Sequence, residues 1–478
     1  MAIVTQARAR TGRAAELGLL ALALLIAVGA YAEVSLAVTG ELPANLATRA
    51  GGLAALALVA HLLVRWKAPY ADPAILPIVV ALNGIGLTMI YRIDLATGSS
   101  GDTGQADQQL MWTFVGVAAA VATLWLISDH RVLRRYTYTA MVAGLALVAL
   151  PLVPFLGVSV NGARIWISIG PMSFQPAELA KIVLAVFFAG YLVTERDTLA
   201  LAGRKVLGLQ LPRVRDLGPI LLAWGASIVI LVGERDLGTS LLFFGMFVAM
   251  LYVATERLSW ILIGLGLFAG GAVLAASLFG HVAARFDAWL TPFDPEILGR
   301  DPGGSGQLVS GLFGLASGGL TGTGWGYGYP TTIPYANSDF IVAALGEELG
   351  LTGLLAILIL YLILAQRGLR AAIGVRDGFG KLFACGMAFV MAFQVFVVVG
   401  GITRLIPVTG LTTPFLALGG SSLVSNWIIV ALLLRISDSA RRPAPPLVDD
   451  GAPDDRPAGP PGRGPAAGSD DETQVVTL

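Results

Sequence analysis

Residues 382–401 read LFACGMAFVMAFQVFVVVGG, twenty consecutive positions without a charged side chain. A helix needs about 20 mostly apolar residues to cross the hydrocarbon core of a bilayer. The rest of the chain has the same character, because 56% of its 478 residues are hydrophobic and only 13% are charged. A soluble domain carries about 25% charged residues. The composition therefore predicts an all-α, polytopic integral membrane protein and excludes an ordinary soluble enzyme.

Similar apolar stretches predict about twelve transmembrane helices. They lie near 16–38, 46–64, 72–91, 109–127, 137–156, 176–193, 217–233, 237–254, 258–279, 339–365, 382–401 and 411–435. Residues 280–338 form a loop much longer than the others, rich in glycine and aromatic residues. Loops of this length are usually functional or disordered, and the aromatic residues favour a packed lid.

The distribution of Lys and Arg predicts the orientation of the chain. With the N-terminus inside, the segments on that side hold 21 of these residues and the opposite segments hold 7. Positive charge favours the cytoplasmic side. We therefore expect both termini in the cytoplasm and residues 280–338 outside. The segment 437–478, rich in Pro, Gly and Asp, should be a disordered cytoplasmic tail.

Charge and residue counts exclude several kinds of partner and site. The chain has 31 Lys and Arg against 31 Asp and Glu, so no basic excess indicates nucleic-acid binding. Cys385 is its single cysteine, and the three histidines lie far apart in sequence. A metal centre built from Cys or His clusters is therefore not expected.

Polar residues interrupt the apolar pattern near the start of the sixth predicted span. Gln175 and Pro176 precede Glu178 and Lys181, and proline suits the first turn of a helix. Glu178 and Lys181 then lie three residues apart on one helical face. An ionisable pair inside a membrane indicates either a functional site or a structural ion pair. Upstream, Arg164 and Trp166 belong to the same outer segment.

Three further polar clusters are predicted at the outer face. Asp236 precedes a span, where capping of that helix is the simpler interpretation and catalysis the alternative. Asp339 lies where the long loop enters a span, again with capping as the alternative to a chemical role. Residues 401–422 contain Arg404, Ser421 and Ser422 among glycines and prolines that break the apolar run. Broken backbone at membrane depth is tolerated where it is buried in protein or lines a cavity.

Acids, arginines and aromatic residues at one membrane face suit a lipid head group that bears sugar and phosphate. The residue types alone do not separate a transporter from an enzyme.

The motifs resemble those of the SEDS family of bacterial cell-wall polymerases (shape, elongation, division and sporulation proteins). The resemblance covers residues 72–436 and rests on five motifs. They are Gln175 to Lys181, Asp236 to Thr239, Ser338 to Ile341, Gly346 to Gly350 and Gly419 to Ser422. The family core has ten spans. Residues 1–71 would therefore add a cytoplasmic N-terminus and two further spans, an arrangement similar to elongation-type members of actinobacteria.

This resemblance implies an activity, a set of partners and roles for individual residues. Members polymerise lipid II into glycan strands with a class B penicillin-binding protein, alongside other elongation or division machinery. The family's essential loop carboxylate corresponds to Asp339, and its paired Glu and Lys to Glu178 and Lys181. One glutamine of the glycine-rich loop matches Gln307, whereas the second is Ser310 here. Ser338 stands where threonine is usual, and Glu234-Arg235 stands where the family has Gln-Pro.

The implied reaction is an inverting glycosyl transfer in the bacterial cytoplasmic membrane, with an extracellular active site. We expect Asp339 to act as the base on the acceptor hydroxyl, and Arg164, Arg235, Arg404 or Lys181 to contact the pyrophosphate. A divalent cation such as Mg²⁺ or Mn²⁺ could share this work, bridging Asp339 and substrate phosphate, although no dedicated cage is visible. Alternatives are a lipid II flippase, a division-type member and a scaffold for a crosslinking partner.

Overall fold

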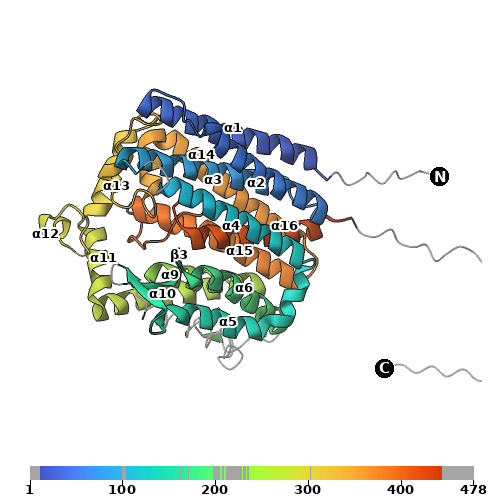
Figure 1. Ribbon diagram of the computed structural model, residues 1–478. Helices are drawn as coiled ribbons and strands as arrows, with labels where there is room; N and C mark the ends of the chain where they lie inside the picture. Colours follow the sequence, from blue (N-terminus) through green and yellow to red (C-terminus); the bar gives the residue numbers. More distant parts are fainter. Residues whose placement is uncertain are drawn as a thin grey trace, which may run out of the picture. The chain divides into compact units, whose positions relative to one another are not determined.

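The structure is a computed structural model. It describes residues 11–99, 104–160, 163–170, 172–196, 236–301 and 303–443, with short stretches or single positions at 205–206, 209–210, 225, 229 and 233. Within these residues the long helices lie side by side, and the helices of 280–338 lie across one end of the bundle (Figure 1). We call this end the loop end.

The described part contains eleven helical segments long and apolar enough to cross a membrane. They are α1 (Arg13–Thr39), α2 (Leu46–Lys67), α3 (Ile75–Thr97), α4 (Gln105–Leu126), His130–Leu152, α6 (Pro176–Thr194), α9 (Leu237–Thr255), α10 (Ser259–Leu278), α14 (Ile341–Gly374), α15 (Gly378–Ile402) and α16 (Gly420–Arg441). The segment His130–Leu152 comprises η1 (His130–Tyr136), α5 (Thr137–Ala149) and η2 (Leu150–Leu152). The predicted polytopic helical architecture is confirmed. Apart from single positions, the predicted span 217–233 lies outside the described residues, as does the predicted tail from residue 444 onward. The tail boundary at 437 is wrong, because α16 continues to Arg441.

Two predicted boundaries are wrong for a local reason. The span expected at 411–435 begins only at Gly420, because residues 403–419 form a loop whose carbonyls accept side-chain hydrogen bonds. Pro414 in that loop has no N–H and cannot take part in a regular helix. The span expected at 339–365 extends to Gly374 and is kinked at Gly350, whose φ of 67° is left-handed.

A small antiparallel sheet follows η2 and was not expected from the sequence. Its strands are β1 (Gly157–Val160), β2 (Ala163–Ile169) and β3 (Met172–Phe174), in the order β1-β2-β3. The predicted span 137–156 therefore ends early, at Leu152. Two very short strands, β4 (Lys205–Val206) and β5 (Leu209–Gln210), form a second antiparallel pair.

The described residues of 280–338 are folded into short helices, and we call this segment the lid. It consists of α11 (Gly280–Leu290), α12 (Pro295–Leu298), α13 (Gly306–Gly318) and η4 (Pro330–Thr332). Gly311 of α13 faces Phe340, and Gly318 faces Glu347. The contacts move from Gly311 to Gly318 on one segment as they move from Phe340 to Glu347 on the other. Helix α13 therefore runs parallel to the first turns of α14.

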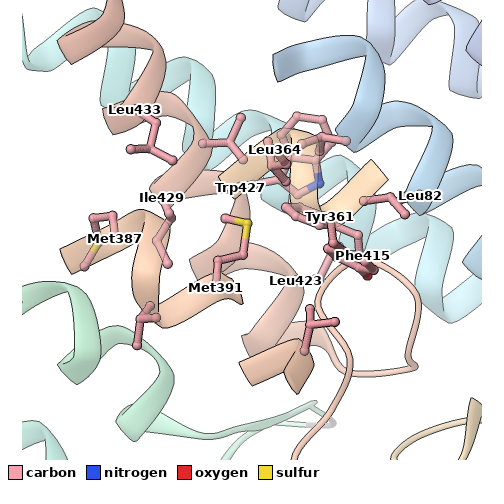
Figure 2. Close-up of a cluster of buried hydrophobic side chains, with 14 of the residues drawn as sticks. Leu82, Tyr361, Leu364, Met387, Met391, Phe415, Leu423, Trp427, Ile429 and Leu433 are labelled. Atoms are coloured by element: carbon pink, nitrogen blue, oxygen red, sulfur yellow. The ribbon is translucent and has the colours of Figure 1, made fainter. Parts of the chain in front are cut away.

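The core lies where α14, α15 and α16 meet α3 and α4. Figure 2 shows Tyr361, Phe415 and Trp427 among aliphatic and methionine side chains of this core. The Tyr361 hydroxyl donates to the Pro414 carbonyl, so the loop 403–419 is held by the core. Small residues permit close helix approach, as expected inside membranes. A Cβ at Gly84 of α3 would lie 2.3 Å from the Ala27 Cβ of α1.

Candidate active site

Helix α6 begins at the loop end and positions a buried ion pair. Gln175 precedes the helix and Pro176 occupies its first turn, as predicted. The Lys181 Nζ lies 2.5 Å from the Glu178 Oε2, and both side chains are buried. A negative side chain in the first turn also suits the positive end of the helix dipole. The predicted pair is therefore present.

Two residues that sequence reasoning missed complete this pair. Lys181 Nζ donates to Gln394 Oε1 of α15 at 3.2 Å, and Ser425 Oγ of α16 donates to Glu178 Oε2 at 3.0 Å. The Gln394 Nε2 donates in turn to the Thr412 carbonyl of the loop 403–419. The pair thus joins α6 to α15, to α16 and, through Gln394, to this loop. Gln394 is the only strongly polar residue in 382–401, a signal that could have identified it.

Asp236 caps α9 and also reaches α6. Its Oδ1 accepts from the Thr239 amide at 2.9 Å, which confirms the predicted cap. Its Oδ2 accepts from Gln175 Nε2 at 3.2 Å. Burial raises the pKa of Asp236, against the opposing effect of the hydrogen bonds from Thr239. One carboxylate oxygen therefore stabilises the helix, and the other faces the neighbouring polar residues.

Asp339 does not cap the helix that follows it. Phe340 is the residue that precedes α14, and no side chain caps that helix. The Asp339 Oδ1 accepts from Ser338 Oγ at 3.1 Å, and Oδ2 accepts from Gln307 Nε2 at 3.4 Å. The capping alternative for Asp339 is therefore wrong. Burial raises the pKa of this carboxyl group, opposed by Ser338, Gln307 and Arg285.

Arg285 of α11 carries a charge close to this part of the site and was not singled out from the sequence. Its Nη1 donates to the carbonyls of Val408 and Thr409 at 3.2 and 3.1 Å. Its charge also acts on Asp236 and on Asp339. Burial lowers the pKa of Arg285, and the two carboxylates oppose this shift. Arg285 therefore acts electrostatically on two carboxylates that are 103 positions apart in the chain.

An apolar groove of about 780 Å³ opens beside Arg285. It lies between α9, α10, α11 and α15, and residues 405–409 contribute to its wall. Phe268, Phe393 and Trp289 are among the residues that line it. Among the described residues of this lining, Arg285 is the only charged one. The groove therefore places one guanidinium group at the edge of an otherwise uncharged lining.

Arg404 connects α11 to the loop 403–419. Its Nε and Nη2 donate to the carbonyls of Trp289 and Leu290 at 2.9 and 2.8 Å. The indole Nε1 of Trp289 donates back to the Arg404 carbonyl at 3.0 Å. Arg404 therefore satisfies carbonyls at the C-terminal end of α11, a structural use of an arginine that sequence reasoning assigned to phosphate.

The other predicted residues lie around this arrangement. Arg164 and Trp166 are half-buried on β2, with Trp166 opposite Val158 of β1. Ser421 and Ser422 are buried in the first turn of α16. In the described part, none of these four hydrogen-bonds to Asp339. Arg235 lies outside the described residues.

The described residues contain no group of three His, Cys, Asp or Glu side chains that could hold a metal ion. The protein atoms that are described do not build a cation cage by themselves.

A multi-span helical membrane protein, with an arginine on the lining of an apolar groove and two carboxylates in the field of that arginine, is the class that this geometry defines. The profile of the FtsW, RodA and SpoVE cell cycle proteins matches residues 73–442, and the chain belongs to this family. It is 49% identical over 439 residues to the peptidoglycan glycosyltransferase RodA of Mycobacterium tuberculosis, covering 91% of this chain and 92% of the relative.

Solved structures show the same fold. A structure of a peptidoglycan synthase complex, concerned with the coordination of polymerization and crosslinking, matches with a TM-score of 0.61 and 27% identity. That match covers 78% of this chain and 99% of the other. The rod shape determining protein RodA of Thermus thermophilus matches with a TM-score of 0.53 and 25% identity, covering 77% of this chain and 96% of the other.

Proposed function

We propose that this protein is a peptidoglycan glycosyltransferase of the elongation type, which polymerises lipid II and releases polyprenyl pyrophosphate. The observation that carries the proposal is the position of Arg285, which borders the apolar groove and interacts with Asp236 and Asp339. A polyprenyl substrate needs such a junction, because its tail is apolar and its head group bears phosphate and sugar. The mycobacterial relatives, named peptidoglycan glycosyltransferases, support the same activity.

The groove suits the lipid tail. Ligand sites usually enclose about 300–1,000 Å³ and are mostly apolar with a few placed polar groups. A tail in this groove would bring its pyrophosphate to Arg285, whose planar guanidinium suits bidentate contact with phosphate. Lys181 is already buried with Glu178 and Gln394. We therefore assign Lys181 to positioning α6, and Arg285 to the leaving group.

Asp339 is the proposed base. It takes the proton from the acceptor's sugar hydroxyl, and that oxygen attacks the anomeric carbon of the donor sugar. The bond between this carbon and the pyrophosphate oxygen breaks, and the leaving group departs with the electron pair. Because the new bond forms opposite the breaking bond, the configuration inverts. The raised pKa of Asp339 brings it closer to the operating pH, which favours general-base catalysis.

A divalent cation would be held mainly by substrate phosphates, with Asp339 as its protein ligand, and it would neutralise charge on the leaving group. The steps above use only residues of this chain.

The decisive experiment is glycan synthesis from fluorescent lipid II by the purified protein, with strands resolved on a gel. Asp339→Asn should lose about 10²–10⁴-fold in rate, the usual contribution of a general base. Asp301→Asn, at an exposed carboxylate of the same lid, is the matched control and should behave as wild type. An Asp339→Asn variant with more than about a tenth of the wild-type rate would contradict the assignment. Transbilayer movement of lipid II without polymer would favour the flippase alternative.

We also propose that the loop end faces outward, that both termini are cytoplasmic, and that a class B penicillin-binding protein crosslinks the product. The excess of Lys and Arg at the other end supports the orientation. Thr331 is exposed on the lid and Cys385 is buried. In a Cys385→Ser background, Thr331→Cys should react with an impermeant thiol reagent in intact cells. Reaction only after permeabilisation would reverse the orientation.

A further inference from the structure

Part of the lid has an unusual composition, and the reaction proposed above does not explain it. Residues 302–338 contain no Asp, Glu, Lys, Arg or His, although the lid lies at the charged end of the molecule. Near its end this segment carries Trp325, Tyr327, Tyr329 and Tyr335 within eleven positions, with threonines between them. Such a surface suits an uncharged ligand with apolar faces and hydroxyl groups.

Three of these aromatic side chains are exposed. Tyr327 is 64% exposed, Tyr329 71% and Tyr335 52%, whereas Trp325 packs against the hydrophobic core. Thr331 and Thr332 are exposed beside them. Gathered apolar groups on a surface usually indicate an interaction site. Tyrosine offers a large rigid face and a polar hydroxyl at low cost in conformational entropy.

The segment is held in place by buried contacts. The Gly326 amide donates to Glu348 Oε2 at 3.0 Å, and Arg92 Nη2 donates to the Gly328 carbonyl at 2.7 Å. Arg92 and Glu348 form a buried ion pair of 2.9 Å. Gly326 also has a φ of 86° and packs so close to α1 that a Cβ would lie 2.7 Å from Ala37. Tyr327 and Tyr329 therefore flank anchored backbone rather than a loosely held loop.

The same segment is tied to the proposed base. The carbonyl of Tyr335 accepts from the amides of Ser338 at 3.0 Å and Phe340 at 3.2 Å, which flank Asp339. Tyr335 has a φ of 56°, a strained value for a residue with a side chain. Strain of this kind persists where surrounding contacts hold it, often at functional sites. The segment that carries the exposed tyrosines thus leads along the chain into the turn that carries Asp339.

We propose that Tyr335, Tyr329 and Tyr327 form a binding track for the growing β-linked amino-sugar strand. This inference rests on the proposed function, since it concerns the strand on which Asp339 acts. A β-linked pyranose presents C–H groups on flat faces, which stack on aromatic rings, and hydroxyl groups, which hydrogen-bond to phenols and threonines. The absence of cations from residues 302–338 argues against pyrophosphate as the ligand of this track. Its rigid backbone lowers the entropic cost of holding the strand.

The test uses the double variant Tyr327→Ala/Tyr329→Ala. Phe313→Ala is the matched control, because Phe313 is 61% exposed on α13 and lies outside the track. One readout is the length of strands made from lipid II. The other is the dissociation constant of the full-length protein for a soluble β-1,4-linked N-acetylglucosamine tetramer. We expect several-fold shorter strands, a smaller fall in lipid II consumption, and about tenfold weaker tetramer binding, in line with truncation of aromatic anchors. Tyr327→Phe/Tyr329→Phe should retain most of the binding.

Each outcome decides the proposal. Normal strand length and normal tetramer binding in the double variant would overturn it. Loss of a copurifying protein with unchanged strands and binding would identify the track as a protein interface and would also overturn it. Wild-type protein that makes no polymer would contradict the proposed function alone, since tetramer binding still tests the track.

Discussion

Two groups of carboxylates in this molecule have different partners. At the end opposite the lid, Asp377 pairs with His130 at 2.8 Å, and Asp72 lies 3.4 Å from Arg367 and 3.5 Å from Arg441. Burial pushes the pKa of Asp377 up, but hydrogen bonds from His130 and Gly380 bring it down to about 2.

At the loop end, Asp236 and Asp339 share Arg285, and burial raises the pKa of both. The difference separates Asp377 and Asp72, which are paired with cationic side chains, from Asp236 and Asp339, whose pKa values are raised by burial. Hydrogen bonds from a cationic partner favour the ionised form of a carboxylate, whereas burial favours its protonated form and raises the pKa.

The largest effect should come from removing the cation of a buried ion pair. Lys181→Met leaves Glu178 buried and unpaired, which typically costs about 3–5 kcal/mol. Thermal unfolding in detergent measures this loss. The double variant Glu178→Gln/Lys181→Met should recover much of the stability, because no lone buried charge remains. Equal stability of Lys181→Met and wild type would show that this pair does not belong with the structural carboxylates.

Removing the shared cation should affect the rate more than the stability. Arg285→Met should lower the rate of polymerisation by about 10²–10³-fold, the usual cost of losing one group that stabilises transition-state charge. Arg300→Met is the matched control, because Arg300 lies in the same lid and its bond to Asp287 is exposed. A large loss of melting temperature without a loss of rate per folded molecule would place Arg285 among the structural cations.

The smallest predicted effect is a difference in pH dependence between the activity, which requires Asp339, and the stability, to which Asp377 contributes. Asp339 must be ionised to act as a base, so activity should fall on acidification while the pH is still above the ordinary value of about 3.9. Because the folded pKa of Asp377 is lowered to about 2, its contribution to stability is present above about pH 4 and is lost between about 4 and 2. Parallel profiles of rate and melting temperature should therefore separate. Asp377→Asn should remove only the acidic loss of stability.

Local patterns were sufficient to predict some parts of the site. Pro176 at the start of α6, the three-residue spacing of Glu178 and Lys181, and Asp236 as a cap all follow from helix geometry. Arg285 could not be placed in this way, since its partners come from distant segments. The capping alternative for Asp339 was wrong because its carboxylate accepts from Gln307 of another helix.

For the fold, too, some features were predicted from the sequence and others were not. Hydropathy predicts the long helices well, because twenty apolar residues have few other stable arrangements in a bilayer. It did not predict β1 to β3, whose three to seven residues carry little periodic signal. It also extended α16 into residues 411–419, since apolar composition does not reveal that carbonyls such as that of Thr412 bind side chains of neighbouring helices.

The hairpin of α1 and α2 has a consequence for shortened or chimeric versions of the protein. It precedes the segment that matches the family profile, yet α1 packs on α3 at Gly84 and on the lid at Gly326. Helix α3 is almost wholly buried, and its Gly84 and Thr88 face Ala27 of α1. Deleting residues 11–71 would turn this glycine- and threonine-containing surface toward lipid and remove its close packing partner. A ten-span derivative would therefore need a redesigned α3. A lid taken from a ten-span relative would have to be adapted to pack against α1.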